Sequence, residues 1–200
     1  MSMKYDITKP PTRGARRVLG AFTEAFFTLI CEKSFESLSV SLICDRSGYP
    51  RATFYNYFDD KYDLLNYYWS TVAGQIDFES FVKYSKDEVF DIYVNRIYDL
   101  MEQHESKISA LLVNNPNGGY LLSSCQLYLS KSIEKKLKII LGDIVMPVSA
   151  TLLADYYANT LLLVFGHRFS SKSGIRTKSD TMDSLYYLMF ERADNPEKLR

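Results

Sequence analysis

Residues 39–65 read SVSLICDRSGYPRATFYNYFDDKYDLL, and this stretch decides what the chain can fold into. A short helix is expected to begin after Ser39 and to end before Gly48, which can take the left-handed backbone conformation that closes a tight turn. Pro50 suits the first position of the next helix, because its missing N–H would have had no partner there. The stretch therefore predicts two short helices around one glycine.

A preceding helix supplies the surface against which these two helices can pack. Thr12 can cap it, and apolar residues recur on one of its faces as far as about Lys33. The expected core joins Phe22, Phe26 and Ile30 to Ile43, Cys44, Phe54 and Phe58. The last helix then turns outward Arg51, Thr53, Tyr55, Asn56 and Tyr57. Such an arrangement predicts a helix-turn-helix, whose last helix fits the major groove of DNA.

The same stretch resembles the DNA-binding pattern of the TetR/AcrR family of bacterial repressors, T-v-x-x-I-A-x-x-a-G-v-s-x-x-t-f-Y-x-x-F-x-x-K-x-x-L. The matching residues are Ser39, Val40, Ile43, Cys44, Ser47, Gly48, Tyr49, Pro50, Thr53, Phe54, Tyr55, Phe58, Lys61 and Leu64. The most specific part is the run from Tyr55 through Phe58 to Lys61. Two positions depart from the pattern, because Tyr49 replaces a small β-branched residue and Pro50 replaces a serine or threonine that could cap the helix or touch phosphate.

The resemblance implies roles for individual residues. It makes Arg51, Ala52 and Thr53 contacts to base edges, and Tyr55, Tyr57 and Lys61 contacts to phosphates. An arginine can pair with guanine through two hydrogen bonds, and a threonine methyl can contact thymine. Lys61, in the first turn of its helix, can join backbone N–H groups at a phosphate. The DNA-binding set is completed by Arg16, Arg46, Pro50 and Asn56.

The charges of the chain balance, with 24 lysines and arginines against 24 aspartates and glutamates, but they are unevenly placed. The first seventeen residues carry one acidic residue, Asp6, against five basic ones, Lys4, Lys9, Arg13, Arg16 and Arg17. Residues 1–11 are therefore expected to form a flexible basic arm that assists DNA binding. The alternative is a solvated, disordered leader without a partner.

Helical spacing continues to the end of the chain, and no strand pattern competes with it. The fold class is all-α, with about nine helices in an N-terminal helix-turn-helix domain (12–60) and a helical ligand-binding and dimerisation domain (61–200). A fourth helix, capped by Asp59 or Asp60, is expected to carry Leu64 and Ile76, and a fifth is expected to follow a capping box of Ser85 and Glu88. Further helices are expected near residues 105–113, 118–141, 148–169 and 180–192.

One recognition helix reads too few base pairs to be specific, so helix-turn-helix proteins usually bind as dimers. The resemblance places a homodimer interface on the last two long helices. It also implies a repressor that leaves its double-stranded DNA operator when a small apolar effector binds among the middle helices. Candidate lining residues for that pocket are Tyr93, Ile97, Met101, Tyr120, Cys125, Tyr128 and Tyr157.

Other classes of protein lack support in the sequence. No nucleophile elbow, phosphate-binding loop or metal-binding spacing occurs, so neither an enzyme nor a metal or other cofactor is expected. The N-terminus lacks the apolar core of a signal peptide and no apolar run could span a membrane, so the chain is expected in the cytoplasm. Two alternatives stay open: a regulator or co-activator of this fold that is controlled by a protein partner, and a helical scaffold.

Overall fold

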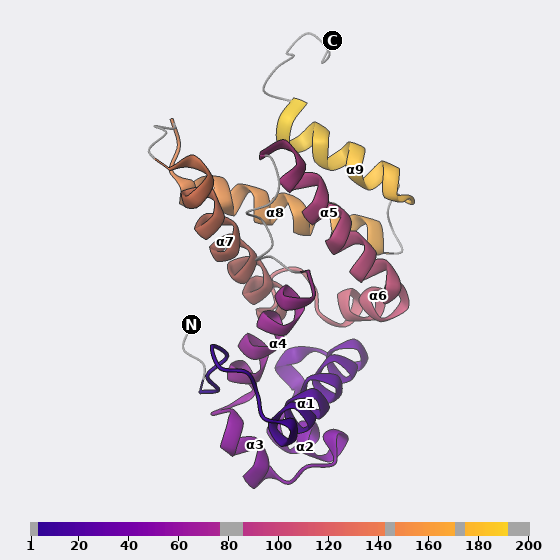
Figure 1. Cartoon of the computed structure of the whole chain (residues 1–200). Helices are drawn as coiled ribbons and strands as arrows, with labels where there is room; N and C mark the ends of the chain where they lie inside the picture. The colour runs from indigo at the N-terminus through magenta and orange to yellow at the C-terminus, as the bar shows by residue number, and fades with distance from the viewer. Residues whose placement is uncertain (1–3, 77–85, 143–146, 171–174, 192–200) are drawn as a thin grey trace.

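The computed structural model describes residues 4–76, 86–142, 147–170 and 175–191, and every regular element within them is helical (Figure 1). The predicted all-α class is confirmed. These residues form α1 (Arg13–Glu32), α2 (Val40–Ser47), α3 (Arg51–Tyr57), α4 (Lys61–Ile76), α5 (Lys86–Gln103), α6 (Glu105–Asn114), α7 (Tyr120–Leu141), α8 (Ala150–Phe169) and α9 (Lys178–Tyr186). A short 3-10 helix, η1 (Phe35–Ser37), precedes α2, and a π-helical turn, η3 (Tyr187–Glu191), continues α9.

Local chemistry sets the ends of the three N-terminal helices. The Thr12 hydroxyl caps α1 by accepting a hydrogen bond from the backbone N–H of Ala15, and the Ser39 hydroxyl caps α2 in the same way. Gly48 ends α2 with φ of 75°, the left-handed conformation that the sequence predicts. Pro50 differs from the prediction by one position: its ψ of 156° is extended, so it precedes α3 rather than opening it. Its ring fixes φ only, and the helix begins one residue later.

Phenylalanines build the core of the N-terminal domain. Phe22, Phe26, Phe35, Phe54 and Phe58 are fully buried. The Phe22 ring meets the Phe54 ring edge-on, with the centroids 5.3 Å apart, an arrangement that aromatic pairs favour. This core extends beyond residue 60, where the sequence predicts the end of the DNA-binding domain, because Leu111 of α6 and Leu121 of α7 belong to the same buried cluster.

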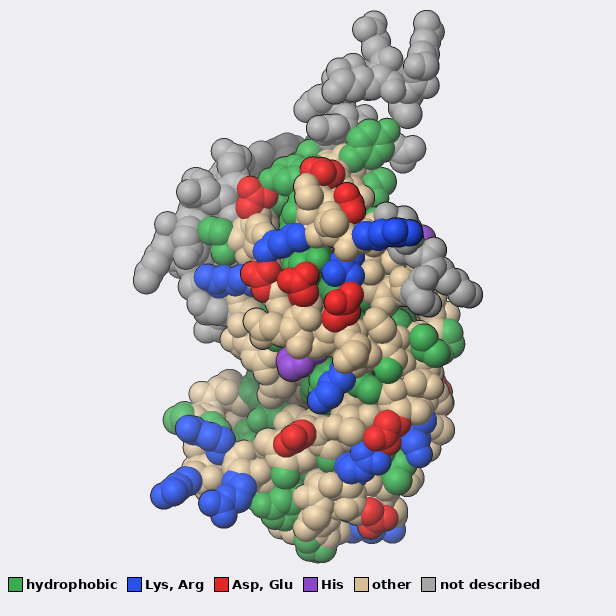
Figure 2. Space-filling view, turned by 90° about the vertical axis from the view of Figure 1, so that its right-hand side faces the viewer, with side chains coloured by type: hydrophobic (Ala, Val, Ile, Leu, Met, Phe, Trp, Pro, Cys, Tyr) green, Lys and Arg blue, Asp and Glu red, His purple; other side chains and the backbone are tan. Residues whose placement is uncertain are grey.

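The larger domain has a second core between α5, α8 and α9. Its buried members are Val94, Tyr98, Leu161, Val164, Phe165, Phe169 and Leu185. Arg168 lies beside this core, where its Nε donates a hydrogen bond to the Tyr98 hydroxyl and its Nη1 pairs with Glu105 at 2.8 Å. Figure 2 shows such acidic and basic side chains side by side over this part of the molecule.

The opposite face of α8 is uncovered and partly apolar. Leu152, Tyr156 and Leu163 are exposed, and they follow one another at spacings of four and seven residues, which places them on one side of the helix. Tyr187 and Phe190, next to α9, are exposed as well. In the described part of the chain, no helix is long and apolar enough to cross a membrane.

Candidate nucleic-acid interface

The recognition helix α3 presents its predicted DNA-binding side chains outward. Arg51, Ala52, Tyr55 and Asn56 are exposed, whereas Phe54 is fully buried in the phenylalanine core. The other two residues assigned to DNA on this helix, Thr53 and Tyr57, are half-buried. A single buried anchor thus leaves most of a short helix available to a groove of DNA.

Arg51 is held in position by its own helix. Its Nη2 donates a hydrogen bond to the Tyr55 hydroxyl at 3.3 Å, and its guanidinium lies 5.9 Å from the centroid of that ring. Residues four apart share one face of a helix, which explains the contact. Tyr55 therefore orients the side chain that is best suited to pair with guanine.

The two other arginines assigned to DNA have different surroundings. Arg16 is exposed on the first turns of α1, next to Arg13 and Arg17. Arg46 is also exposed, but both of its terminal nitrogens donate to the Glu32 carboxylate at 2.8 Å, which joins α2 to the end of α1. Figure 2 shows lysine and arginine side chains projecting from the lower part of the molecule, where this domain lies.

Lys61 has a different environment from the one that a phosphate contact requires. Its ammonium donates to three backbone carbonyls, those of Phe35 at 3.1 Å and of Glu36 and Leu38 at 2.9 Å each. It also lies 4.8 Å from the Phe35 ring centroid. An ammonium has three N–H donors, and these three bonds use them all. Burial lowers the pKa of Lys61. The structure thus shows Lys61 tying α4 to η1, where the sequence predicts a ligand of phosphate.

The beginning of the predicted flexible arm is docked rather than free. Lys4 and Tyr5 contact the end of α3 and the start of α4, and Figure 1 shows this N-terminal segment beside α4. Sequence reasoning assigned residues 1–11 by their charge, which gives no indication of a tertiary contact. Asp63, a buried carboxylate that receives the backbone N–H of Lys4, was missed for the same reason.

Comparison with protein families agrees with this geometry. Residues 23–68 match the model of the bacterial regulatory proteins of the tetR family, a range that contains α2, α3, η1 and the first half of α4. The matched segment holds the helix-turn-helix, and it resembles the same family as the pattern of residues 39–65 predicts.

Comparison with individual proteins adds little to the family match. No curated protein matches the chain significantly. Among solved structures, it is similar to the crystal structure of the regulatory protein TetR from Rhodobacter sphaeroides. That similarity has a TM-score of 0.49 at 16% sequence identity, over 86% of this chain and 96% of the other.

The seven residues predicted to line an effector pocket of this regulator lie in different surroundings. Ile97 and Met101 pack against the second core, and Tyr120 is exposed at the domain junction, where its ring stacks on Phe35. The other four are half-buried: Tyr93, Cys125, Tyr128 and Tyr157. Burial raises the pKa of the Cys125 thiol to about 12.

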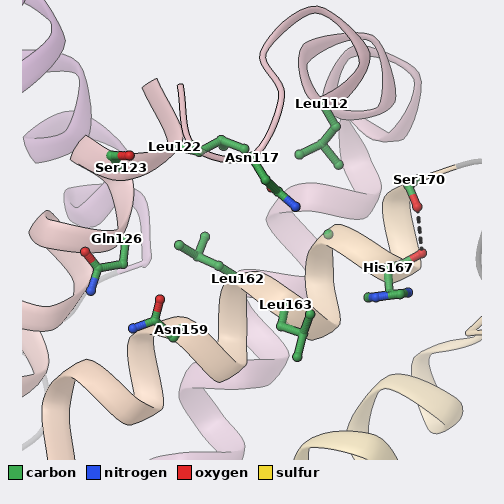
Figure 3. A pocket seen from close by; sticks show the side chains of 12 residues that line it. Leu112, Asn117, Leu122, Ser123, Gln126, Asn159, Leu162, Leu163, His167 and Ser170 are labelled. Carbon is green, nitrogen blue, oxygen red and sulfur yellow. Dashed lines mark hydrogen bonds between the residues drawn. The ribbon is translucent and has the colours of Figure 1, made fainter. Parts of the chain in front are cut away.

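A cavity of about 610 Å³ lies elsewhere, between α6, α7 and α8 (Figure 3). The prediction named none of its lining residues, which are Leu112, Asn117, Gly118, Leu122, Ser123, Gln126, Asn159, Leu162, Leu163, Gly166, His167 and Ser170. In Figure 3, Gln126 and Asn159 lie at one end of the cavity and His167 at the other. The lining combines leucines with neutral polar groups and contains no lysine, arginine, aspartate or glutamate.

The turn that borders this cavity also holds the DNA-binding domain. Asn115 is buried; its Oδ1 accepts a hydrogen bond from the Phe35 N–H, and its Nδ2 donates to the Ile30 carbonyl, both at 2.8 Å. The neighbouring Asn114 donates to the Cys31 carbonyl at 2.7 Å. Asn117 and Gly118, which follow Asn115 by two and three residues, line the cavity. The cavity wall therefore continues along the chain into the two asparagines that are hydrogen-bonded to the end of α1.

Proposed function

We propose that this TetR-family regulator is a sequence-specific repressor that binds duplex operator DNA as a homodimer and leaves it when a small molecule binds the larger domain. Residues 12–60 read the DNA, and residues 61–200 sense the ligand and dimerise. The observation that carries the proposal is the outward face of α3, where Tyr55 orients Arg51 above a helix anchored by Phe54. The protein then acts in the cytoplasm, as a regulator and not as an enzyme.

The division of roles among the DNA-binding residues is the one that the family resemblance implies. We assign base edges to Arg51, Ala52 and Thr53, and the flanking phosphates to Tyr55 and Tyr57. Arg16 and Asn56 are exposed and serve phosphates as well. Lys61 supports the interface by holding η1, since its ammonium is already bound by carbonyls. Arg46 reaches DNA only if it gives up Glu32.

Dimerisation is supported by the uncovered face of α8. Leu152, Tyr156 and Leu163 form an exposed row on this helix, and burying such a row against a second copy removes apolar surface from water. A two-fold dimer would present two recognition helices to two half-sites, which a single short helix cannot read alone.

Ligand control is supported by the cavity and its wall. Its volume of about 610 Å³ suits a small molecule, and its uncharged lining favours a neutral ligand with apolar parts and a few hydrogen-bonding groups. A ligand that moves Asn117 or Gly118 would move Asn115, which is bonded to the end of α1. The ligand then releases the DNA if it binds more tightly to the conformation in which the reading domain does not fit the operator.

A second candidate is control by a protein partner without a small effector. The observation that favours it is Leu163, which borders the cavity and has a relative exposure of 54%. An apolar side chain at the mouth of a cavity can equally be covered by another protein.

The experiment that tests the proposal starts with the purified full chain and the DNA upstream of its own gene, at two salt concentrations and with excess nonspecific duplex. We expect saturable, competitor-resistant binding in steps of two subunits, and reduced transcription from a promoter that carries the bound site. Arg51→Ala should lower the preference for the operator about fivefold or more, because a bidentate arginine–guanine pair contributes about 1 to 3 kcal/mol of discrimination. Arg176→Ala, at an exposed arginine outside residues 12–60, is the matched control and should leave the preference unchanged. The proposal would be contradicted if all of the binding were nonspecific and salt-sensitive.

Effector control is tested on the same operator complex. Neutral small molecules are screened for release of the DNA, and Asn117→Leu should weaken the response to any that succeed while leaving operator affinity unchanged. Release by a protein and by none of the small molecules would support the second candidate.

A further inference from the structure

The N-terminal segment makes a charged contact with the end of the recognition helix. The Lys4 ammonium donates to the Tyr55 carbonyl at 2.6 Å and lies 3.2 Å from the Asp59 carboxylate. The Tyr55 carbonyl belongs to the last turn of α3, whose carbonyls have no partner within the helix. A cation at this position also interacts favourably with the negative end of the helix dipole.

The backbone of the same residue is held by α4. The Lys4 N–H donates to both oxygens of Asp63, at 3.2 and 3.3 Å. Asp63 lies in the first turn of α4 and is 7% exposed, and one of its oxygens also accepts the Asp59 N–H at 3.0 Å. One buried carboxylate thus joins the N-terminal segment, the α3–α4 connection and α4. Asp60 caps α4 separately, by accepting the N–H groups of Tyr62 and Asp63.

An aromatic contact completes this attachment. The centroid of the Tyr5 ring lies 5.9 Å from that of the Tyr57 ring in α3 and 5.7 Å from that of the Tyr67 ring in α4. Tyr67 in turn packs on the buried Phe58 at 5.5 Å. Tyr5 is therefore inserted between the two helices, at the edge of the phenylalanine core.

We propose that Lys4 and Tyr5 form a brace that fixes the C-terminal end of α3 against α4, and that they are positioning residues for operator reading rather than ligands of DNA. The inference rests on the proposed function of α3. A helix of seven residues is too short to be stable alone, so its orientation depends on what holds its ends. The brace supplies that hold at the end where Tyr55 and Tyr57 lie.

The brace divides the basic arm into two parts. Lys4 has its ammonium on α3 and its backbone on α4, whereas Lys9 is exposed and pairs with Asp6, three residues away in the same segment. If the arm acted by its charge, both lysines would contribute alike to DNA binding. If Lys4 acts as a brace, only Lys4 affects the geometry of α3.

The salt dependence of operator binding separates these two roles. Each phosphate contact contributes about 0.9 to the slope of log K against log salt concentration, so a lost contact lowers the slope by about one. We expect Lys4→Gln, which loses one charge-assisted hydrogen bond, and Tyr5→Ala, which loses two aromatic contacts, each to weaken operator binding roughly tenfold at fixed salt, with the slope unchanged. Tyr5→Phe should restore affinity because it keeps the ring. Lys9→Gln is the matched control and should leave affinity within about twofold of wild type.

A second measurement tests the brace in the absence of DNA. Hydrogen exchange of the α3 amides should be faster in Lys4→Gln than in wild type or Lys9→Gln, with the amides of α1 unchanged. A Lys4→Gln variant that lowers the salt slope by about one would overturn the brace and make Lys4 a phosphate ligand. Unchanged affinity together with unchanged exchange would overturn it as well. If wild type binds no operator, the proposed function fails, and the exchange measurement still decides on the brace.

Discussion

The N-terminal and C-terminal parts of the chain handle their apolar residues in opposite ways. Around α1–α4 the large aromatic side chains turn inward, and Phe22, Phe54 and Phe58 are fully buried. On α8, by contrast, Leu152, Tyr156 and Leu163 are exposed, although the helix has a buried face of its own and the Tyr156 hydroxyl donates to the Leu188 carbonyl. Burying a large apolar side chain stabilises a protein by about 1.5 to 3 kcal/mol. A row of exposed apolar side chains is therefore unusual on a surface that no other molecule covers.

This difference indicates what each part needs in order to work. The aromatic core around α1–α4 is complete within one subunit. The outward side chains of α3 are not part of that core, so they are available to contact DNA. On α8, the exposed row leaves apolar surface that the proposed dimer would bury. Substitutions in the two regions should therefore separate folding from association.

The largest effect is expected in the reading domain. Phe54→Ala removes a fully buried ring and should lower the free energy of unfolding by about 3 to 5 kcal/mol. Chemical denaturation of the purified variant measures this loss. Asn56→Ala, an exposed position on the same helix, is the control and should change stability by less than about 0.5 kcal/mol. A loss below about 1 kcal/mol for Phe54→Ala would show that this core is not what holds α3.

A smaller effect is expected at the junction of the two parts. Asn115→Ala leaves the Phe35 N–H and the Ile30 carbonyl without their partner, and each buried unpaired group costs about 1 to 3 kcal/mol. We expect a total loss of roughly 2 to 3 kcal/mol, with faster hydrogen exchange at the Phe35 amide. Asn117→Ala, two residues away and exposed, should change neither quantity. Equal behaviour of the two variants would show that the turn does not connect the domains.

The smallest change in free energy is expected on α8. Leu163→Lys places a charge in the proposed dimer interface and should weaken association about tenfold, or about 1.4 kcal/mol, which sedimentation equilibrium can measure. The thermal stability of the dissociated subunit, measured in dilute protein, should be unchanged, because Leu163 contributes little to the core of its own subunit. Val113→Lys, at an exposed position of α6, is the control for added charge. Identical association of the two variants would place the dimer interface elsewhere.

Sequence reasoning predicted the reading domain well because its signals are local. Gly48 requires a particular backbone conformation, Ser39 caps the helix that follows it, and Phe54 and Phe58 recur at a helical spacing. These features depend on neighbours within a few residues. The one-residue difference at Pro50 is of the same local kind, since proline fixes φ and leaves ψ open.

The cavity and the brace were not predicted, because both depend on residues far apart in the chain. The sequence predicts tyrosines as pocket lining from their chemistry; in the structure Tyr120 stacks on Phe35, and the cavity between α6, α7 and α8 has other lining residues. Lys4 meets Asp63 across 59 positions, and Lys61 meets Phe35 across 26. Charge and periodicity carry no information about such pairs, which only the packing of whole helices decides.

The hydrogen bonds of Asn115 set a condition for building hybrid regulators from this chain. A hybrid that joins its reading domain to a foreign sensor near residue 60 would leave behind Asn115, Leu111 and Leu121, and with them part of the core and the partners of Ile30 and Phe35. The segment from the end of α6 to the start of α7 must therefore be transplanted together with the reading domain. A foreign sensor can substitute for it only if it offers an amide side chain and two leucines at the same places.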